Sequence, residues 1–363
     1  MSDKKVKMMF ASIDKEYVTL VPELAEIKGN GTDMVYYGKD NRYPEYLYSL
    51  YTDCTSLKTV IDGTADYVTG DDIVSNIPSL PVYVNGKMSW RDFVYNTTRD
   101  LLLYGAYAYE VIMRKDMSSP ASLHYIDIRD LRSNEDNEVF YYNPDFKKKY
   151  VKNSNTVVLP KFKADIPQPA SIVYVKQTDS NSTYPVPRYS GALKCCEIER
   201  QIDVLHLAGV TNGFYGSYIV NIATGVPSDE EQDELERDFN DKFCGAGNAG
   251  RFILNFSNGK DNAATIEKLE TVDFGDKYTA AAKRSREQIY ASFRAIPALF
   301  GVMTETTGFN EQEFSEAFKL YNRTMVRPIQ RKLVDSLDYV FNQKGSIEIV
   351  PFSLDTNNEK NVD

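Results

Sequence analysis

The spacing of apolar residues predicts two helices in the first third of the chain. Apolar positions recur every three to four residues over 46–68, and the GDD that follows predicts the end of this helix. A second helix is expected over 90–109, because Ser89 before it is a preferred N-cap residue. Residues 123–177 then form short β-rich runs separated by polar and proline turns. About the first 185 residues are therefore expected to form an α+β domain.

A long helical pattern covers residues 190–212, where apolar and charged residues are intermingled around the whole helix. A surface helix of a single domain normally carries one apolar stripe. Two interpretations fit this pattern equally well. The helix is either wedged between two neighbouring molecules or buried in the core of one.

A small insertion is predicted over residues 217–271. The strand YIVNIA precedes an acidic helix, and Ser228 with Glu231 three residues later forms a capping box at its start. The segment GAGNAG ends this helix, and RFILNF and ATIEKLET follow as strands. The insertion therefore has the order strand, helix, strand, strand.

A basic helix follows, and from position 280 it runs AAAKRSREQIYASFRAIPALFGV. At ~100° per residue, one arc of this helix is apolar and consists of Ala282, Ile289, Phe293 and Ile296. The opposite side is cationic, with Arg286 near the boundary, and it carries Lys277, Lys283, Arg284 and Arg294. A charged helix face is usually only solvated surface, but here only Glu287 offers close compensation, to Lys283. The next segment, MTETTGFN, has few apolar anchors and is expected to be a mobile loop.

The last long helix is expected after this loop, with Asn310 and Glu313 at its cap and a bend at Pro328. Its apolar stripe consists of Phe314, Phe318, Tyr321, Met325, Ile329, Leu333 and Leu337. The run SIEIVPF predicts a final strand before a polar tail.

Composition narrows the class of protein. The chain has 363 residues, 42% of them hydrophobic, and a formal net charge of −10, which argues against a general DNA-gripping basic face. No apolar run approaches the ~18 residues of a membrane span, so no membrane partner is expected. The four cysteines, with no C-x-x-C spacing, indicate neither a zinc site nor a disulfide framework, and unpaired thiols suit a reducing cytoplasm.

Motifs of catalysis are missing from the sequence, which indicates a protein that is not an enzyme and needs no cofactor or metal. There is no P-loop, no H-E-x-x-H and no G-x-S-x-G. His124 and His206 have no suggested partner and are interpreted as structural. Gly245, Gly247 and Gly250 spell the dinucleotide fingerprint, but that motif functions after a strand and before a helix. Here the order is reversed, so a nucleotide-binding enzyme built on GAGNAG remains only a competing hypothesis.

The order of these parts resembles that of the portal proteins of tailed double-stranded DNA bacteriophages, over nearly the whole chain. The segments that carry the resemblance are GKDNRYP, RDLLLYGAYAYEVI, PRYSGAL, NGFYGS, FCGAGNAGRFILNF, REQIYASFRAIPALFGV and TGFNEQEFSEAFKLYNRTMVRPIQRKL. The resemblance implies a portal-type α+β protomer in a ring, usually dodecameric, at one capsid vertex. A ring-forming head-tail adaptor that is not the portal is a further alternative. The order of two long helices with a small insertion between them, which a portal has as stem, clip and stem, speaks against it.

The resemblance also implies a division of the chain. The wing would be 1–186, the first stem helix 187–216, the clip 217–271, the second stem helix 272–300 and the tunnel loop 301–310, followed by a long wing helix and strand over 311–350. Residues 351–363 would be a polar tail or a minimal crown, so a crown function is in doubt.

In this scheme three groups of residues have roles. The channel for double-stranded DNA would be lined by Lys277, Lys283, Arg284 and Arg286. The tunnel loop would include Thr304, Glu305, Thr306, Thr307, Gly308 and Phe309, and the clip would bind partners through Glu230, Glu231, Glu234 and Glu236. The implied partners are further copies of the chain, the major capsid protein or scaffold, the terminase large subunit and a head-tail adaptor. The implied location is the virion, after assembly in the host cytoplasm.

Overall fold

The computed structural model of the chain describes residues 22, 26–28, 33–148, 155–177, 182–212, 218–222, 228, 231, 234, 252–256, 274–302 and 311–352. Side chains are described within these ranges except at 26–28, 208–212, 218–222, 252–256, 274–277 and 311. The chain divides into two compact units. The smaller unit comprises Met1–Leu20 and Glu197–Ser285, and the larger unit comprises Val21–Cys196 and Arg286–Asp363.

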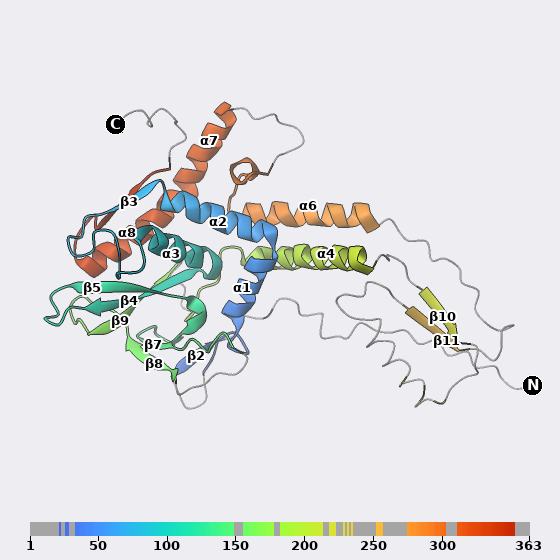
Figure 1. Cartoon of the computed structure of the whole chain (residues 1–363), viewed down its shortest axis with the longest axis horizontal. Helices are drawn as coiled ribbons and strands as arrows, with labels where there is room; N and C mark the ends of the chain where they lie inside the picture. Colours follow the sequence, from blue (N-terminus) through green and yellow to red (C-terminus); the bar gives the residue numbers. More distant parts are fainter. Residues whose placement is uncertain are drawn as a thin grey trace, which may run out of the picture. The chain divides into compact units, whose positions relative to one another are not determined.

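The larger unit mixes helices and strands, as Figure 1 shows. Its helices, apart from the ends of two that continue into the smaller unit, are α1 (Tyr43–Asp53), α2 (Thr55–Thr69), α3 (Trp90–Tyr104), α7 (Glu311–Tyr321) and α8 (Arg327–Phe341). Its strands are β1 (Glu26–Lys28), β2 (Met34–Tyr37), β3 (Asp72–Ser75), β4 (Ala106–Met113), β5 (Pro120–Ile126), β6 (Leu131–Asn134), β7 (Val139–Tyr142), β8 (Val157–Pro160), β9 (Ala170–Lys176) and β12 (Ile347–Val350). The expected α+β class is confirmed.

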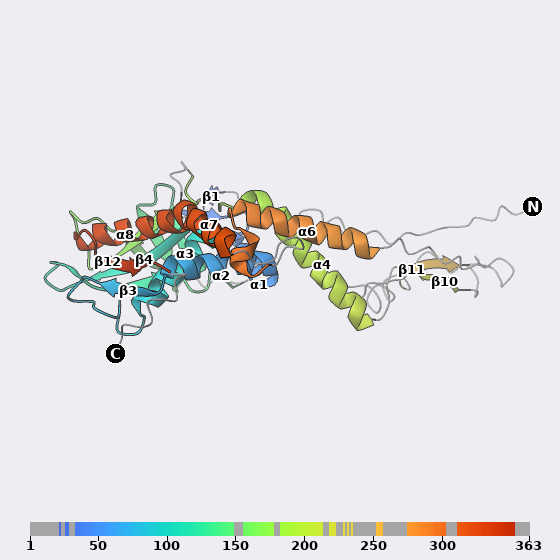
Figure 2. The same ribbon diagram turned by 90° about the horizontal axis from the view of Figure 1, so that it is seen from above.

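Three antiparallel sheets organise this unit. One has the order β5-β4-β9, a second β1-β2-β6-β7-β8, and a third pairs β12 with β3. In the first sheet Tyr109 of the central strand pairs with Tyr125 on one side and Val173 on the other. The third sheet joins the chain end to the region after α2, and Figure 2 shows β12 beside α8 from above.

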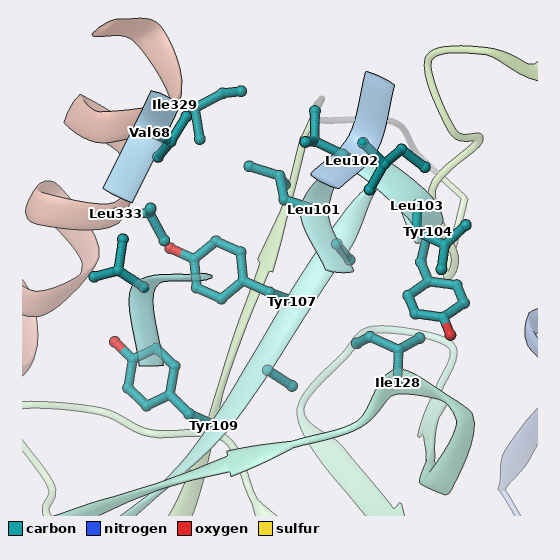
Figure 3. Packing of buried hydrophobic residues seen from close by; sticks show 14 of the residues in the cluster. Val68, Leu101, Leu102, Leu103, Tyr104, Tyr107, Tyr109, Ile128, Ile329 and Leu333 are labelled. Carbon is teal, nitrogen blue, oxygen red and sulfur yellow. The ribbon is translucent and has the colours of Figure 1, made fainter. Parts of the chain in front are cut away.

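One part of the core of the larger unit lies between the β4 sheet and helix α8. Tyr107 and Tyr109 are two residues apart on β4, so both side chains leave the same face of the sheet. Both rings are buried and point toward α8, where Leu333 is also buried (Figure 3). Their hydroxyls reach the Ser336 Oγ on α8 at 2.9 and 3.3 Å. Each buried phenol therefore has the polar partner that its hydroxyl requires.

The structure interrupts one predicted helix and shortens another. The helix predicted over 46–68 is two helices, because buried Cys54 between α1 and α2 adopts an extended backbone with φ −101° and ψ 106°. The helix predicted over 90–109 begins at its Ser89 cap, which accepts a bond from the Asp92 N–H, but it stops at Tyr104. Gly105 there is left-handed, with φ 80°, and a Cβ on it would lie 3.3 Å from Pro185. The residues beyond Gly105 belong to β4.

The long helix near the C-terminus follows its predicted stripe but is not continuous. Phe318, Tyr321, Met325, Ile329, Leu333 and Leu337 are all buried, which confirms most of the stripe. Between α7 and α8, Asn322–Val326 form a π-helical segment in which the Arg327 N–H bonds the Asn322 carbonyl. Pro328 follows directly and cannot donate a backbone hydrogen bond, so the irregularity lies where the proline predicted a bend.

The smaller unit contains most of α4 (Leu193–Asn212) and of α6 (Phe274–Ser292), together with strands β10 (Tyr218–Ile222) and β11 (Phe252–Phe256). The two strands pair in parallel, with Tyr218 opposite Phe252. Parallel neighbours need a crossover between them, which agrees with the predicted order of strand, helix and strand. The ring centroids of His206 on α4 and Tyr278 on α6 lie 6.4 Å apart.

A buried carboxyl group makes the stability of the larger unit pH-dependent. Asp100 on α3 is 1% exposed, accepts a 2.8 Å bond from the Tyr125 hydroxyl and lies 3.2 Å from Arg99. Burial, which outweighs the attraction of Arg99, raises the pKa of Asp100 to about 7. The folded protein therefore keeps this proton to a higher pH than the unfolded chain does.

We expect the free energy of unfolding to fall as pH rises from the unfolded pKa of Asp100 toward 7, because only the unfolded state has then lost the proton. Asp100→Asn keeps an acceptor for Tyr125 but removes the titration. Between pH 5 and pH 8 the native chain should therefore lose about 2 kcal/mol of unfolding free energy that the variant keeps. Urea unfolding of both proteins at the two pH values measures the difference, and an equal pH dependence in both would show that Asp100 does not titrate in this range.

Candidate nucleic-acid interface

Helix α6 separates apolar and cationic side chains as the sequence predicts. Three alanines and several long side chains, all good helix formers, make up its central part. Ser285, Ile289 and Tyr290 are buried, and Ala282 is half-buried. The sequence-based arc missed Ser285 and Tyr290, although Ser285 lies four residues before Ile289 and so shares its side of a helix.

The cationic surface of α6 consists of Lys283, Arg284 and Arg286, all exposed. Within the described part of the chain, none of the three forms an ion pair, not even with Glu287. Lys277 lies on the same helix, but its side chain is outside the described residues. Uncompensated guanidinium and ammonium groups are the groups that bind phosphate oxygens. This surface can therefore make salt-sensitive contacts with a polyanion.

The end of α6 differs from its prediction. A helix was expected over 272–300, but α6 ends at Ser292 and Pro297–Phe300 form a separate 3₁₀ turn. The Ala295 N–H bonds the Tyr290 carbonyl at 2.9 Å, and the Arg294 N–H bonds the Ala291 carbonyl at 3.0 Å. These two bonds are those of a Schellman motif, whose left-handed residue is usually glycine. Here that residue is Arg294, with φ 53°, so this cation does not lie on the helix as predicted.

Aromatic side chains hold this end of α6 in the larger unit. Phe293 is fully buried and stacks on Tyr189 with ring centroids 5.4 Å apart. In the following turn, the Leu299 carbonyl accepts a 2.7 Å bond from the Tyr67 hydroxyl. Phe300 packs so closely on Gly63 that a Cβ there would lie 2.8 Å from its ring. Residues 301–302 are thereby fixed at the start of the predicted tunnel loop, whereas Thr304–Phe309 lie outside the described residues.

The acidic segment of the predicted clip is described at two of its four candidate residues. Glu231 and Glu234 are exposed, while Glu230 and Glu236 lie outside the described residues. The capping box is present, because the Ser228 N–H donates to the Glu231 Oε2 at 3.0 Å and the Glu231 N–H donates to the Ser228 Oγ at 3.4 Å. The GAGNAG segment also falls outside the described residues, so its role stays a prediction.

The described part of the chain offers no metal site. No three His, Cys, Asp or Glu side chains gather there in a way that could hold a metal ion. His124 lies 3.0 Å from the Ser122 hydroxyl and is not near a nucleophilic cysteine or a third ligand among these residues. Cys54, Cys195 and Cys196 form no disulfide in this part of the chain. None of the described helices is long and apolar enough to span a bilayer.

Comparisons with known proteins agree with this arrangement. The family model described as phage portal protein matches residues 78–360. An uncharacterised protein of Rickettsia bellii (strain RML369-C) is 28% identical over 149 residues, which is 40% of this chain and 37% of that protein. The matched part thus spans little more than a third of this relative.

Two solved structures share the fold. One is the neck of a native gene transfer agent particle computed with C12 symmetry, with 18% identity, a TM-score of 0.54 and coverage of 91% of this chain and 88% of that chain. The other is the neck of an empty particle of this agent computed with C6 symmetry, with 15% identity, a TM-score of 0.55 and coverage of 90% and 88%. At sequence identities this low, the similarity shows a shared fold and nothing more.

Proposed function

Because this chain belongs to the phage portal protein family, we propose that it forms a ring at one capsid vertex, through which double-stranded DNA enters and leaves. Twelve copies per ring are consistent with the C12 symmetry of one similar neck structure and with the C6 symmetry of another, since sixfold symmetry is contained in twelvefold symmetry. The protein would act in the virion, as a conduit and docking platform without catalysis.

The main support for the proposed DNA channel is the cationic surface of α6. Lys283, Arg284 and Arg286 are exposed and free of ion pairs with other described residues, on a protein whose net charge is −10. A conduit needs weak and reversible phosphate contacts, since tight binding would stop the DNA from sliding. A few exposed cations on an otherwise acidic chain satisfy that requirement. Lys277 would extend the same lining, and Thr304–Phe309 would form the narrowest part of the channel.

The exposed side chains of helix α4 are a second observation in favour of the proposed ring. In the smaller unit this helix exposes three large apolar side chains, Ile198 (44%), Val204 (39%) and Leu207 (69%). At ~100° per residue, Ile198 lies on a different side of the helix from Val204 and Leu207, so apolar groups are exposed on more than one face. Of the two interpretations of its intermingled pattern, these exposures favour a helix packed between neighbouring copies.

Native mass spectrometry and negative-stain imaging of the purified chain test the assembly, and binding of duplex DNA at low and high salt tests the channel. We expect rings that bind duplex DNA weakly and lose it as salt rises. Rings that ignore DNA at low salt would instead support a head-tail adaptor. Thermal stabilisation by a nucleotide would support the competing enzyme built on GAGNAG, since ligand binding to the native state raises its melting temperature.

The clip is proposed to bind the terminase large subunit during packaging and the head-tail adaptor afterwards. We expect charge reversal at Glu230, Glu231, Glu234 and Glu236 to reduce terminase docking while the ring stays intact. The charges at 231 and 234 are exposed, and exposed charges contribute mainly to association rate and specificity rather than to folding. Co-sedimentation of rings with terminase measures docking, and native mass spectrometry measures the ring. Loss of the ring with normal docking in the remainder would identify this segment as a contact between subunits.

A further inference from the structure

Two arginines that are distant in the sequence flank one pair of stacked aromatic rings in the larger unit. Arg188 precedes Tyr189, and Arg294 follows Phe293. The buried rings of Tyr189 and Phe293 stack with an interplanar angle of 22°, so the two arginines flank the same pair of rings. Partial burial and the nearby charge of Arg294 both lower the pKa of Arg188. The two cations therefore repel each other, and the fold keeps them together.

The guanidinium of Arg188 is held in place by neutral groups. Its Nη1 donates to the Met325 sulfur at 2.8 Å. With the Gln177 amide oriented so that its oxygen faces Arg188, that oxygen accepts from Nε at 2.9 Å and from Nη2 at 3.1 Å. These contacts use three of the five N–H groups of a guanidinium. Two remain, and among the described residues no carboxylate forms an ion pair with Arg188.

Arg294 is positioned at a cost in backbone conformation. Its φ of 53° is in the left-handed region that glycine occupies without strain. The helix dipole favours a cation near a helix C-terminus. An arginine in the last turn of α6 would gain this benefit without backbone strain, but that turn carries no basic residue. The Arg294 side chain is exposed and has no ion-pair partner among the described residues. A strained residue with a free charged side chain is a candidate for binding.

We propose that Arg188 and Arg294 together bind one phosphate group. Guanidinium N–H groups match phosphate oxygens in pairs, and two guanidiniums that repel each other are stabilised by a dianion or monoanion between them. The identification of this phosphate as part of duplex DNA rests on the proposed function. Free inorganic phosphate offers the same chemistry.

The test compares Arg188→Gln and Arg294→Gly with the native chain, and uses Arg323→Gln as a control that removes an exposed cation elsewhere in the larger unit. Melting temperatures are measured in 50 mM inorganic phosphate and in sodium chloride of equal ionic strength. Phosphate should raise the melting temperature of the native chain and of the control, but not of the two variants. Arg294→Gly should also melt higher than the native chain in chloride, because glycine relieves the left-handed strain. A gain in stability together with a loss of phosphate response is not the behaviour of a misfolded variant.

Binding of a 30-base-pair duplex across a salt series identifies the source of the phosphate. If DNA supplies it, the variants should bind about tenfold more weakly at low salt, and the slope of log K against log salt should decrease in magnitude by about 1 per lost contact. A lost phosphate response with unchanged DNA slopes would assign the site to free phosphate. If no protein responds to phosphate and the slopes are equal, the inference is overturned. If the native chain responds to phosphate but does not bind DNA, the proposed channel fails and the phosphate site stands.

Discussion

Phe293→Ala is expected to prevent ring assembly, because it removes a fully buried ring at the point where α6 joins the larger unit. Truncation of a buried phenylalanine costs about 3–5 kcal/mol, through lost burial and the cavity that remains. Here the loss also leaves Tyr189 without its stacking partner, while the Tyr189 hydroxyl still bonds the Leu103 carbonyl at 2.9 Å. A cost of that size is a large part of the stability of a typical domain. Urea unfolding measures the change, and native mass spectrometry shows whether rings form.

Phe293→Leu is the matched control for this prediction. It keeps an apolar side chain at the same position and should lose considerably less stability than the alanine variant. If Phe293→Ala unfolds like the native chain and still forms rings, Phe293 does not anchor this end of α6.

Neutralising Lys283, Arg284 and Arg286 together to glutamine should have the opposite effect. Folding and ring formation should hardly change, because exposed charges contribute about 0–1 kcal/mol per pair and these three have no ion-pair partner among the described residues. Duplex DNA binding at low salt should fall at least tenfold, and its dependence on salt should weaken, as phosphate contacts are lost. Packaging or retention of DNA should fail in particles that contain intact rings.

A control with the same change in net charge is available in the larger unit. Lys87, Arg114 and Lys115 are also exposed, and their replacement by glutamine should leave DNA binding close to that of the native chain. If both triple variants lose DNA equally, the effect is one of net charge. If the α6 variant loses the ring while DNA filling in surviving particles is normal, the three cations are structural.

The local structure that the sequence predicted correctly rests on short-range signals. The Ser89 cap and the Ser228 capping box each need only neighbours within three residues to satisfy a backbone N–H. The apolar stripe from Phe318 to Leu337 repeats with the helical period, which is set by backbone geometry alone. The separation of apolar and cationic side chains on α6 follows from the same period.

Several strands escaped prediction, and β6 did so because its residues become typical of a strand only in context. β6 consists of LRSN, whose polar residues contradict β-propensity, yet Arg132 within it is 1% exposed. Its Nη2 donates to the Asn41 carbonyl at 2.7 Å, and its Nη1 donates to the Leu131 carbonyl at 2.7 Å. No local sequence pattern predicts that a distant turn supplies hydrogen-bond acceptors for a buried guanidinium. β2 consists of MVYY, a short run of mainly strand-forming residues for which no strand was expected, and it pairs with β6.

The sequence by itself determined the α+β class, most of the helices and the cationic surface of α6, since periodicity and capping are properties of neighbouring residues. The tertiary structure decided where the helices end. Cys54 is extended within the core, and Gly105 turns left-handed where a Cβ would lie 3.3 Å from Pro185. It also decided that Arg188 and Arg294 flank the same pair of rings, because Tyr189 stacks on Phe293. Such contacts depend on how distant segments pack, which no local pattern encodes.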